Sequence, residues 1–490
     1  MKITRNDAVA TAIPGERYTP FALAKKLGAL AILESASFTH GRDRYSLILA
    51  REAFRIRQDG QGVFFSIDGQ DIPYRNGDIL EALLSVATQN ALPPDGIPLP
   101  GAGIGFLGYE FCARCDTIRL APQSDGIGIP ESEFIVGHVY LVFDHFTDTI
   151  HIFGLNYAEH EIDLEQAIAD IKARLADLDF SYLAPPPEFT PAVVVSDEKA
   201  SRETFVAGVE AIKDHIVRGN LLQAVMSRRL ELESTESALE AYRRLRSKSP
   251  SPYLFYLDFG SYQLVGASPE SLVRVRDSVA SIRPIAGTRR RGKNAEEDEA
   301  LRKALLADPK ERAEHLMLVD LARNDLGRVC VPGSVRLSRS MDVENFSHVM
   351  HIVSDVIGQT PGAGEGGSAS GKPGTGPARG IDVLRAAFPA GTVSGAPKIR
   401  AIEILSGLER ERRTFYAGAV GYVEPDGDLD FCIAIRCALK AGKRWVLQAG
   451  AGIVHASEAD REWEETNEKL MAMRAVLEGS GAEAKVEAMQ

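Results

Sequence analysis

Alternating apolar and polar residues predict several short strands in the first third of the chain. The runs RYSLILA, FRIRQ and GVFFSI, all between residues 42 and 75, alternate or are rich in β-branched and aromatic residues, and Gly, Asp and Gln turns separate them. Residues 134–144 and 150–155 predict two further strands. We therefore expect this region to contribute part of a β-sheet.

Apolar residues at helical spacing predict a helix on each side of a proline-rich break. Residues 164–178 follow a helical pattern, after which four prolines fall between Pro185 and Pro191. A second helix is predicted over 201–218, where Ser201 and Thr204 can cap its first turn. The break places a linker at 181–198, between an N-terminal region at 1–180, which supplies part of the sheet core, and a second domain at 199–478.

Two segments lack the apolar residues that a packed core needs. The insert at 360–380 consists almost wholly of Gly, Ser, Ala and Pro, so we expect a mobile surface loop. A tolerated insertion is favoured over a functional lid, although the composition leaves both readings open. Residues 479–490 form a C-terminal tail after the last predicted helix.

The segment 308–325, DPKERAEHLMLVDLARND, predicts a helix that carries two acids on one face. Asp308 can cap the helix, and Pro309 suits its first position. Glu311 and Glu314 then stand three residues apart on the same face. Taken alone, this pattern is most often a solvated charged helix, but paired carboxylates also suit a hard cation.

A similar arrangement is predicted near the C-terminus. The helix after Ser457 has an apolar stripe made of Trp463, Thr466, Leu470, Met473 and Leu477. Glu462, Glu465 and Lys469 lie on the flank of this stripe. Two acids and a cation therefore follow one edge of a second helix.

Three further blocks carry residues that suit ligand binding. VLQAGAGIV, at 446–454, predicts a strand that runs into a loop at Gly450, Ala451 and Gly452, where backbone N–H groups are accessible. RPIAGTRRRG, at 283–292, places three arginines beside a Gly-Thr pair and predicts a position for an anionic ligand. FSHVMHIVS, at 346–354, has two histidines in an apolar run, where a buried structural histidine is the common alternative.

Composition excludes several classes of partner. The 490 residues are 44% hydrophobic and 25% charged, as in ordinary globular proteins, and the net charge of −12 disfavours nucleic acid and anionic membranes. No apolar run is long enough to span a membrane, and the N-terminus has no signal-type segment, so we expect a cytoplasmic protein. The five cysteines predict packed or plain thiols rather than disulfides, and the single CxxC at 112–115 predicts no zinc site.

In their order along the chain, these blocks closely resemble the chorismate-utilising enzymes, and within them the large subunits (component I) of anthranilate synthase. The resemblance covers 201–477 and continues through LESAS, GRDRYSL, GFLGYEF and VFDH in the first part. It implies an α+β fold with a large antiparallel core of two packed sheets and outer helices. It also implies chorismate as substrate and Mg2+ as cofactor.

The resemblance assigns roles to individual residues. Glu314 and Glu465 match the metal ligands, and Glu311 and Glu462 match nearby catalytic acids. His351 matches the catalytic histidine associated with pyruvate elimination, and Glu270 matches the acid that protonates the departing ring hydroxyl. The residues matched to substrate binding are Gly287, Thr288, Thr392, Tyr416, Arg436, Gly450, Ala451, Gly452 and Lys469.

Two positions distinguish among relatives. Aminodeoxychorismate synthases commonly carry a nucleophilic lysine in a PIKGT motif, where this chain has Ala286. Isochorismate- and salicylate-forming relatives place a basic lysine where this chain has Gln223, and an amide cannot deprotonate water. Ammonia is thus the expected nucleophile and anthranilate the expected product. An aminodeoxychorismate synthase, a 2-amino-2-deoxyisochorismate synthase and a catalytically silent tryptophan-sensing scaffold stay as alternatives.

The resemblance also implies a partner and an inhibitor. Ammonia would come from glutamine through a separate glutaminase subunit, so we expect a hetero-oligomer. LESAS and SPSPYLFY resemble the segments that hold inhibitory L-tryptophan in feedback-sensitive members. The residues matched to this site are Glu34, Ser35, Pro252, Tyr253 and Leu254.

Overall fold

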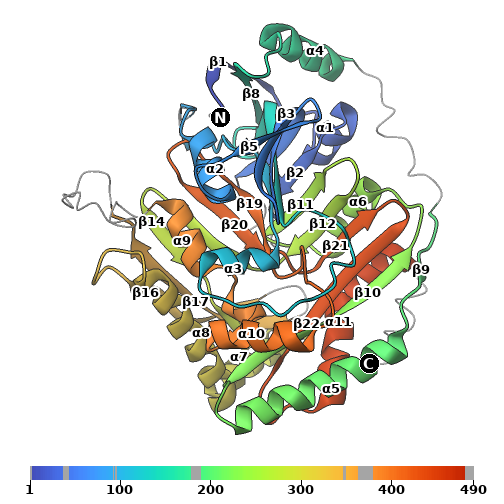
Figure 1. Cartoon of the computed structure of the whole chain (residues 1–490), viewed down its shortest axis with the longest axis vertical. Coiled ribbons are helices and arrows are strands. Elements are labelled where there is room, and N and C mark those ends of the chain that lie inside the picture. The colour runs from blue at the N-terminus through green and yellow to red at the C-terminus, as the bar shows by residue number, and fades with distance from the viewer. Residues whose placement is uncertain are drawn as a thin grey trace.

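The fold is an antiparallel β core with helices on its outer faces (Figure 1). The structure is a computed structural model, and it describes residues 3–36, 44–91, 93, 96–177, 189–345, 349–361 and 379–479. Their strands form two ladders that share β3 (Tyr45–Asp59) and β7 (Ser132–Asp144). The predicted α+β class with two antiparallel sheets is confirmed.

The first ladder runs in the order β1, β8, β7, β3, β2, β11, β12, β21, β22, β10, and β10 also pairs with the short strands β9 and β18. The bounds of its other strands are β1 (Arg5–Pro14), β2 (Ala31–Glu34), β8 (Thr149–Tyr157), β9 (Val193–Val194), β10 (Gln223–Glu233), β11 (Tyr253–Asp258), β12 (Gln263–Ser268), β18 (Gly395–Ala396), β21 (Cys437–Ala441) and β22 (Arg444–Ile453).

The second ladder runs in the order β5, β4, β3, β7, β6, β19, β20, β13, β14, β17, and β17 also pairs with β15 and β16. Its other bounds are β4 (Gly62–Ile67), β5 (Gln70–Tyr74), β6 (Ile104–Leu107), β13 (Ser271–Arg276), β14 (Val279–Ile282), β15 (Ile285–Arg290), β16 (Arg336–Asn345), β17 (Val349–Gln359), β19 (Ala419–Val423) and β20 (Leu429–Ile433).

The expectation of separate strands at RYSLILA and FRIRQ is wrong, because β3 runs continuously through both. The register of β3 against β7 shifts around Arg51 and Glu52, which marks a bulge. A bulge bends a strand without ending it, so one long strand can serve two sheets. The bend therefore falls between the two runs, at Arg51 and Glu52.

The hydrophobic core lies between the two ladders. Phe106, Phe134, Phe255 and Phe431 belong to one apolar cluster with side chains from both ladders. Along β11, the side chains of Phe255 and Leu257 belong to this cluster. Those of Leu254 and Tyr256 belong to a second cluster beneath outer helices, because successive side chains of a strand point to opposite faces. The strand is thus buried on both faces.

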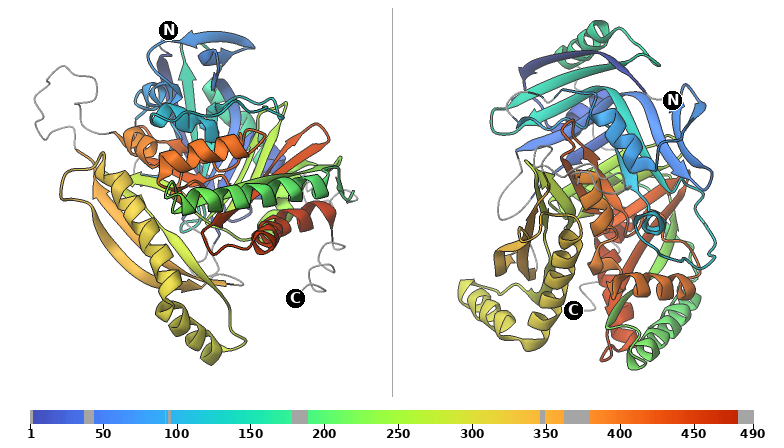
Figure 2. Two further views of the ribbon diagram at one scale, coloured as in Figure 1. Left: turned by 60° about the horizontal axis from the view of Figure 1, so that its bottom comes forward. Right: turned by 60° about the vertical axis from the view of Figure 1, so that its left-hand side comes forward.

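The helices lie at the outside of the core. Their bounds are α1 (Pro20–Leu27), α2 (Ile79–Ala87), α3 (Cys112–Cys115), α4 (Leu164–Ala176), α5 (Glu198–Val217), α6 (Ala238–Lys248), α7 (Ala295–Ala307), α8 (Pro309–Gly327), α9 (Gly380–Ala387), α10 (Lys398–Leu408) and α11 (Ala459–Glu478). Figure 2 shows α7 and α8 (yellow) grouped with β15–β17, apart from α5, α10 and α11. None of the described helices is both long and apolar enough to cross a bilayer.

The N-terminal region and the second domain share both sheets. Strand β2 pairs with β11, and β6 pairs with β19, across the predicted boundary. Residues 181–188 of the predicted linker, 362–378 of the insert and 480–490 of the tail lie outside the described residues. The five cysteines are free thiols, and all except Cys115 are buried.

Candidate active site

Helix α8 presents the first pair of predicted acids. Asp308 caps it by accepting from the N–H groups of Lys310 at 3.0 Å and Glu311 at 3.3 Å, and Pro309 occupies its first turn. The apolar residues Leu318, Val319 and Leu326 are buried, whereas Glu311 and Glu314 are only partly buried. The helix thus presents both acids beside β15.

Helix α11 presents the second pair. Its stripe of Trp463, Thr466, Leu470, Met473 and Leu477 is buried as the spacing predicts. Glu462 and Glu465 are partly buried at its flank. The Lys469 ammonium donates to Glu465 Oε1 and to the Gly450 carbonyl, each at 2.7 Å, and so ties α11 to β22.

The two helices bring their carboxylates within electrostatic reach of each other. Burial raises the pKa of Glu314, and the negative charges of Glu311 and Glu465 raise it further. Burial also raises the pKa of Glu462, with a smaller contribution from Glu465. Because like charges disfavour ionisation, a cation between α8 and α11 would relieve the repulsion.

A bound Mg2+ fits this donor set only as a partly protein-ligated ion. Within the described part of the chain, no three His, Cys, Asp or Glu side chains gather into a group that could hold a metal ion. Mg2+ is commonly bound by one or two carboxylates together with waters and substrate oxygens. Glu314 and Glu465, one from each helix, suit that mode.

Glu270 stands where the end of β12 meets η4 (Gly391–Val393). The Thr392 hydroxyl donates to Glu270 Oε1 at 2.9 Å. Desolvation raises the pKa of Glu270 to about 7, against the opposing effects of the Thr392 hydrogen bond and the Lys469 charge. A carboxyl group with this pKa carries a proton for a large share of the time at neutral pH and can donate it.

His351 and Gly287 come together through the pairing of β15 with β17. Thr288 is opposite His351 in this ladder, and the register shifts at Gly287, where φ is 77°. The ring Nδ1 of His351 lies 3.2 Å from the Gly287 carbonyl oxygen, and a Cβ on Gly287 would lie 3.3 Å from Glu311 Oε2. Burial lowers the pKa of His351, which favours the neutral imidazole. The side chain of Thr288 is not among those that the structure describes.

Arg436 has a left-handed backbone, with φ of 53°, directly before β21. Solvent reaches its side chain, yet desolvation by the surrounding protein lowers its pKa, while Tyr416 and Glu465 act in the opposite direction. A strained non-glycine residue persists only where its neighbours hold it, and such residues cluster at functional sites. Arg436 is therefore held in place close to Glu465.

The expectation of a loop at 450–452 is wrong, because these residues continue β22. Gly450 pairs with Ser227 and Gly452 with Val225 of β10. A Cβ on Gly450 would lie 2.8 Å from the Met226 carbonyl and 3.1 Å from Tyr416 Oη, which explains the glycine. Ala451 points to the opposite face, into an apolar cluster with α5 and α10. Its side chain is therefore not part of the site.

Gln223 lies beside Gly452. A Cβ on Gly452 would lie only 2.6 Å from Gln223 Nε2. Gln223 is buried, and its Oε1 has no hydrogen-bond partner within the described residues. A buried acceptor of this kind suits a ligand that donates a hydrogen bond.

The three arginines after Gly287 do not form an anion site. Their ion pairs with the caps and first turns of α7 and α8 are Arg289 to Asp308 at 2.7 Å, Arg290 to Glu297 at 3.1 Å and Arg291 to Asp298 at 2.5 Å. Acids favoured at helix N-termini therefore neutralise the basic run. That part of the sequence prediction is wrong.

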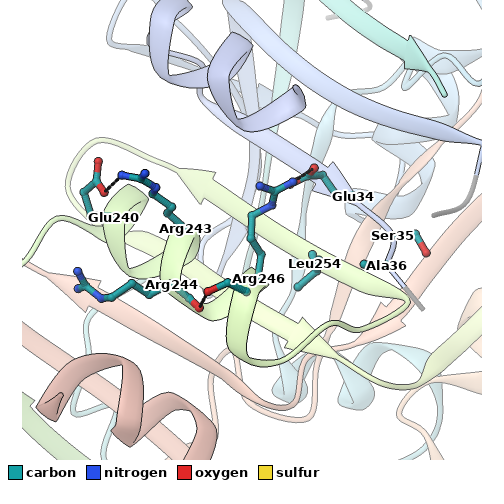
Figure 3. A pocket seen from close by; sticks show the side chains of 9 residues that line it. Glu34, Ser35, Ala36, Glu240, Arg243, Arg244, Arg246 and Leu254 are labelled. Carbon is teal, nitrogen blue, oxygen red and sulfur yellow. Dashed lines mark hydrogen bonds and ion pairs between the residues drawn. The ribbon is translucent and has the colours of Figure 1, made fainter. Parts of the chain in front are cut away.

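Three of the five residues predicted to bind tryptophan meet at a cavity of about 460 Å³ between α6 and the ends of β2 and β11 (Figure 3). Glu34, Ser35 and Leu254 line it, and Glu34 pairs with Leu254 in the ladder. Tyr253 points to the other face, where its hydroxyl donates to Asp430 at 3.0 Å. The side chain of Tyr253 is therefore not a wall of this cavity, and Pro252 is not among its lining residues.

The sequence prediction missed the charged wall of this cavity. Arg243, Arg244 and Arg246, all on α6, line it with Glu240. Tyr242 and Arg246 are four residues apart, so they share a helix face and both reach Glu34. The spacing within AYRRLRSK is the signal that would have shown this.

Comparison with known proteins places the chain within a family. A family model described as chorismate binding enzyme matches residues 38–475. Anthranilate synthase component 1 of Spirochaeta aurantia is 53% identical over 469 residues, which cover 95% of this chain and 94% of that protein. The counterpart in Pseudomonas aeruginosa is 40% identical over 466 residues, covering 91% and 89%.

Solved structures share the fold. The crystal structure of anthranilate synthase component I from Streptococcus pneumoniae matches with a TM-score of 0.75 and 36% identity, covering 88% of this chain and 92% of that one. The menaquinone-specific isochorismate synthase from Escherichia coli matches with a TM-score of 0.68 at 18% identity, covering 97% and 96%. At that identity the second match concerns the fold alone.

Proposed function

The chain belongs to the chorismate binding enzyme family, and on this premise we propose that it is the chorismate-converting component of an anthranilate synthase. It converts chorismate and ammonia into anthranilate, pyruvate and water. The observation that carries this function is the meeting of a protonatable Glu270, a neutral His351 and paired carboxylates from α8 and α11 around Arg436 and Gly450.

We assign substrate binding to the positive charge of Arg436 and to the strand backbone at Gly450. The Arg436 guanidinium can grip a substrate carboxylate with two parallel hydrogen bonds. Tyr416 is buried with its hydroxyl against Gly450, so we assign Tyr416 and the β22 backbone to one wall of the substrate site. Mg2+, held by Glu314 and Glu465 with help from Glu311 and Glu462, would neutralise the substrate carboxylate and polarise it when bound.

In the first step ammonia adds to the ring while the ring hydroxyl leaves as water. Glu270 supplies the proton that the hydroxyl needs, and its pKa of about 7 suits that role. Gln223 cannot activate water, but its unpaired Oε1 can accept a hydrogen bond from ammonia. The nucleophile is therefore ammonia rather than hydroxide.

In the second step the aminated intermediate loses pyruvate and becomes aromatic. A proton leaves the carbon that bears the amino group, its C–H electrons enter the ring, and the C–O bond to the enolpyruvyl group breaks. The neutral imidazole of His351 accepts that proton, because burial keeps its pKa below the ordinary value. The released enol becomes pyruvate on protonation.

The activity test is direct. The purified chain is incubated with chorismate, Mg2+ and ammonium salt, while anthranilate fluorescence and product masses are followed. Anthranilate with equimolar pyruvate supports the proposal. An aminated product without pyruvate would instead indicate a 2-amino-2-deoxyisochorismate or aminodeoxychorismate synthase, and no turnover would support a silent scaffold.

The metal assignment has its own test. The double variant Glu314→Gln with Glu465→Gln should abolish magnesium-dependent loss of chorismate. The matched control is Glu203→Gln with Glu296→Gln, two exposed acids on α5 and α7 outside the site. If the first double variant keeps normal turnover and magnesium dependence, the metal assignment is wrong.

We also propose a glutaminase subunit as partner and L-tryptophan as feedback inhibitor. The relatives named component 1 imply a second component, and the chain alone should use ammonium but not glutamine. Adding a glutaminase component should confer glutamine-dependent turnover. Tryptophan would bind the cavity at Glu34, Ser35 and Leu254 and lower chorismate affinity or rate.

A further inference from the structure

The carboxylate expected to receive the effector's amino group already has partners. Only 3% of the Glu34 side chain is exposed, and it pairs with Arg246 Nη2 at 2.8 Å. The Tyr242 hydroxyl donates to the other carboxylate oxygen at 2.6 Å. Because a carboxylate can accept about four hydrogen bonds, an ammonium group would either join these donors on Glu34 or take the place of one of them.

Arg246 is the donor that can move. Tyr242 is fully buried in the core, whereas Arg246 has 19% of its side chain exposed and stands in the last turn of α6. Figure 3 shows Arg246 reaching along the cavity to Glu34, with Leu254 beside them. A long, partly exposed side chain can change partners without disturbing the core.

The other two arginines of the cavity wall have partners of their own. Arg244 pairs with Glu236 at 3.1 Å, and Arg243 lies 3.5 Å from Glu240, which Lys25 also approaches at 2.7 Å. Neither pairs with Glu34 in the structure. Arg246 is thus the cation whose position depends on what binds Glu34.

We propose that Arg246 exchanges Glu34 for the carboxylate of a bound α-amino acid. This inference rests on the proposed tryptophan regulation and names the residue that recognises the carboxylate. The effector's ammonium takes the place of Arg246 on Glu34, and the released guanidinium pairs with the effector's carboxylate. Two ion pairs replace one, so neither buried charge is left unpaired.

The exchange predicts which ligands bind. An indole acid without an amino group would draw Arg246 away and leave Glu34 buried and unpaired, which is strongly unfavourable. An indole amine without a carboxylate satisfies Glu34 but gives Arg246 no partner. Tryptophan satisfies both, and a cavity of about 460 Å³ with Leu254 in its wall has room for an aromatic side chain.

The test compares L-tryptophan, tryptamine and indole-3-propionate by titration calorimetry on the full chain. The natural chain should bind tryptophan about tenfold or more tightly than tryptamine, and indole-3-propionate most weakly. In Arg246→Gln, the preference for tryptophan over tryptamine should fall about tenfold or more, because tryptophan loses the partner of its carboxylate and tryptamine no longer has to displace Arg246 from Glu34. The matched control is Arg243→Gln, which also replaces a charged guanidinium with an amide and should leave the preference for tryptophan over tryptamine unchanged.

Several outcomes overturn the proposal. The first is that Arg246→Gln keeps the preference of the natural chain for tryptophan over tryptamine. The second is that Arg243→Gln loses this preference instead. The third is that the natural chain does not bind tryptophan. Because Arg246 lies outside the catalytic residues, ammonium-dependent anthranilate formation in each sample reports separately on the proposed activity. If Arg246→Gln does not fold, the double variant Glu34→Gln with Arg246→Gln removes both charges and should show no preference for tryptophan over tryptamine.

Discussion

Glu270 and His351 are both partly buried, and desolvation by the surrounding protein moves their pKa values in opposite directions. The charged form of a carboxyl is its base, so desolvation raises the pKa of Glu270 to about 7. The charged form of an imidazole is its acid, so desolvation lowers the pKa of His351. One environment therefore yields a proton donor and a proton acceptor near neutral pH, as a two-step proton transfer requires.

The Glu270 assignment predicts a pH dependence with a definite sign. Its acid form is the donor and is populated below its pKa, so kcat/KM for chorismate, at a fixed concentration of free ammonia, should fall as pH rises through about 7. The Thr392 hydroxyl lowers this pKa, so Thr392→Val should move the falling limb upward by about one pH unit. An unshifted limb in Thr392→Val would show that another group controls it.

Gly452 predicts a steric effect on substrate binding. In Gly452→Ala the new Cβ would lie 2.6 Å from Gln223 Nε2, so the buried amide must turn away from its position. We expect the KM for chorismate to rise about tenfold with little loss of folding stability. Gly407→Ala is the control, because a Cβ there meets no atom within 4 Å, and its KM should stay within about twofold. Equal KM values in the two variants would contradict the placement of Gln223 at the site.

At the scale of elements, local signals predicted the helices well. The cap at Asp308 and the stripe on α11 depend on residues within two turns, so the sequence is sufficient to locate them. The interpretation of Gly450 and Gly452 failed because glycine serves both loops and close strand contacts, and only the position of Tyr416 distinguishes the two. The prediction of an anion site at the basic run after Gly287 failed because its ion-pair partners lie outside the run, in α7 and at the cap of α8.

One contact between elements predicts a large effect on stability. Lys398 at the start of α10 pairs with Asp325 of α8 at 2.7 Å, with side-chain exposures of 11% and 7%. This buried pair joins α8 to the segment after η4, and removing one partner leaves the other as an unpaired buried charge. Lys398→Met or Asp325→Leu should each lower the free energy of unfolding by about 3–5 kcal/mol.

The double variant distinguishes this pairing from two independent contacts. Lys398→Met with Asp325→Leu removes both charges, so it should lose clearly less stability than the sum of the two single changes. Urea unfolding followed by intrinsic fluorescence measures all three variants. A double variant whose loss equals the sum would contradict the coupling.

At the scale of the whole molecule, the order of strands lies beyond what local sequence patterns can specify. Strand β2 pairs with β11, more than 200 residues later, and β6 pairs with β19 at still greater separation. Alternation shows that a segment forms a strand and which face is buried, but it does not select a partner among many similar strands. The resemblance to known enzymes supplied the two-sheet core, and the proline-rich break does not separate the sheets.

This strand order gives the proposed tryptophan cavity a short physical connection to the proposed active site. Leu254 in the cavity wall pairs with Ala267, whose N–H donates to the Arg436 carbonyl at 3.1 Å. Beside it, the Tyr253 hydroxyl donates to Asp430 of β20, the strand that leads to Arg436. A displacement of β11 by an effector would therefore act on the backbone of Arg436, the arginine that we propose binds the substrate carboxylate.

Removing the Tyr253 hydroxyl should weaken this coupling without removing the effector site. In Tyr253→Phe, tryptophan should bind within about twofold of its natural affinity, but the factor by which saturating tryptophan raises the KM for chorismate should fall about twofold to tenfold. Tyr256→Phe is the matched control, because its hydroxyl bonds Asp258 at the far end of β11. Since coupling is a free energy shared by two sites, chorismate should also weaken tryptophan binding less in Tyr253→Phe than in the control. Equal coupling in both variants would mean that β11 does not act on Arg436 through Asp430.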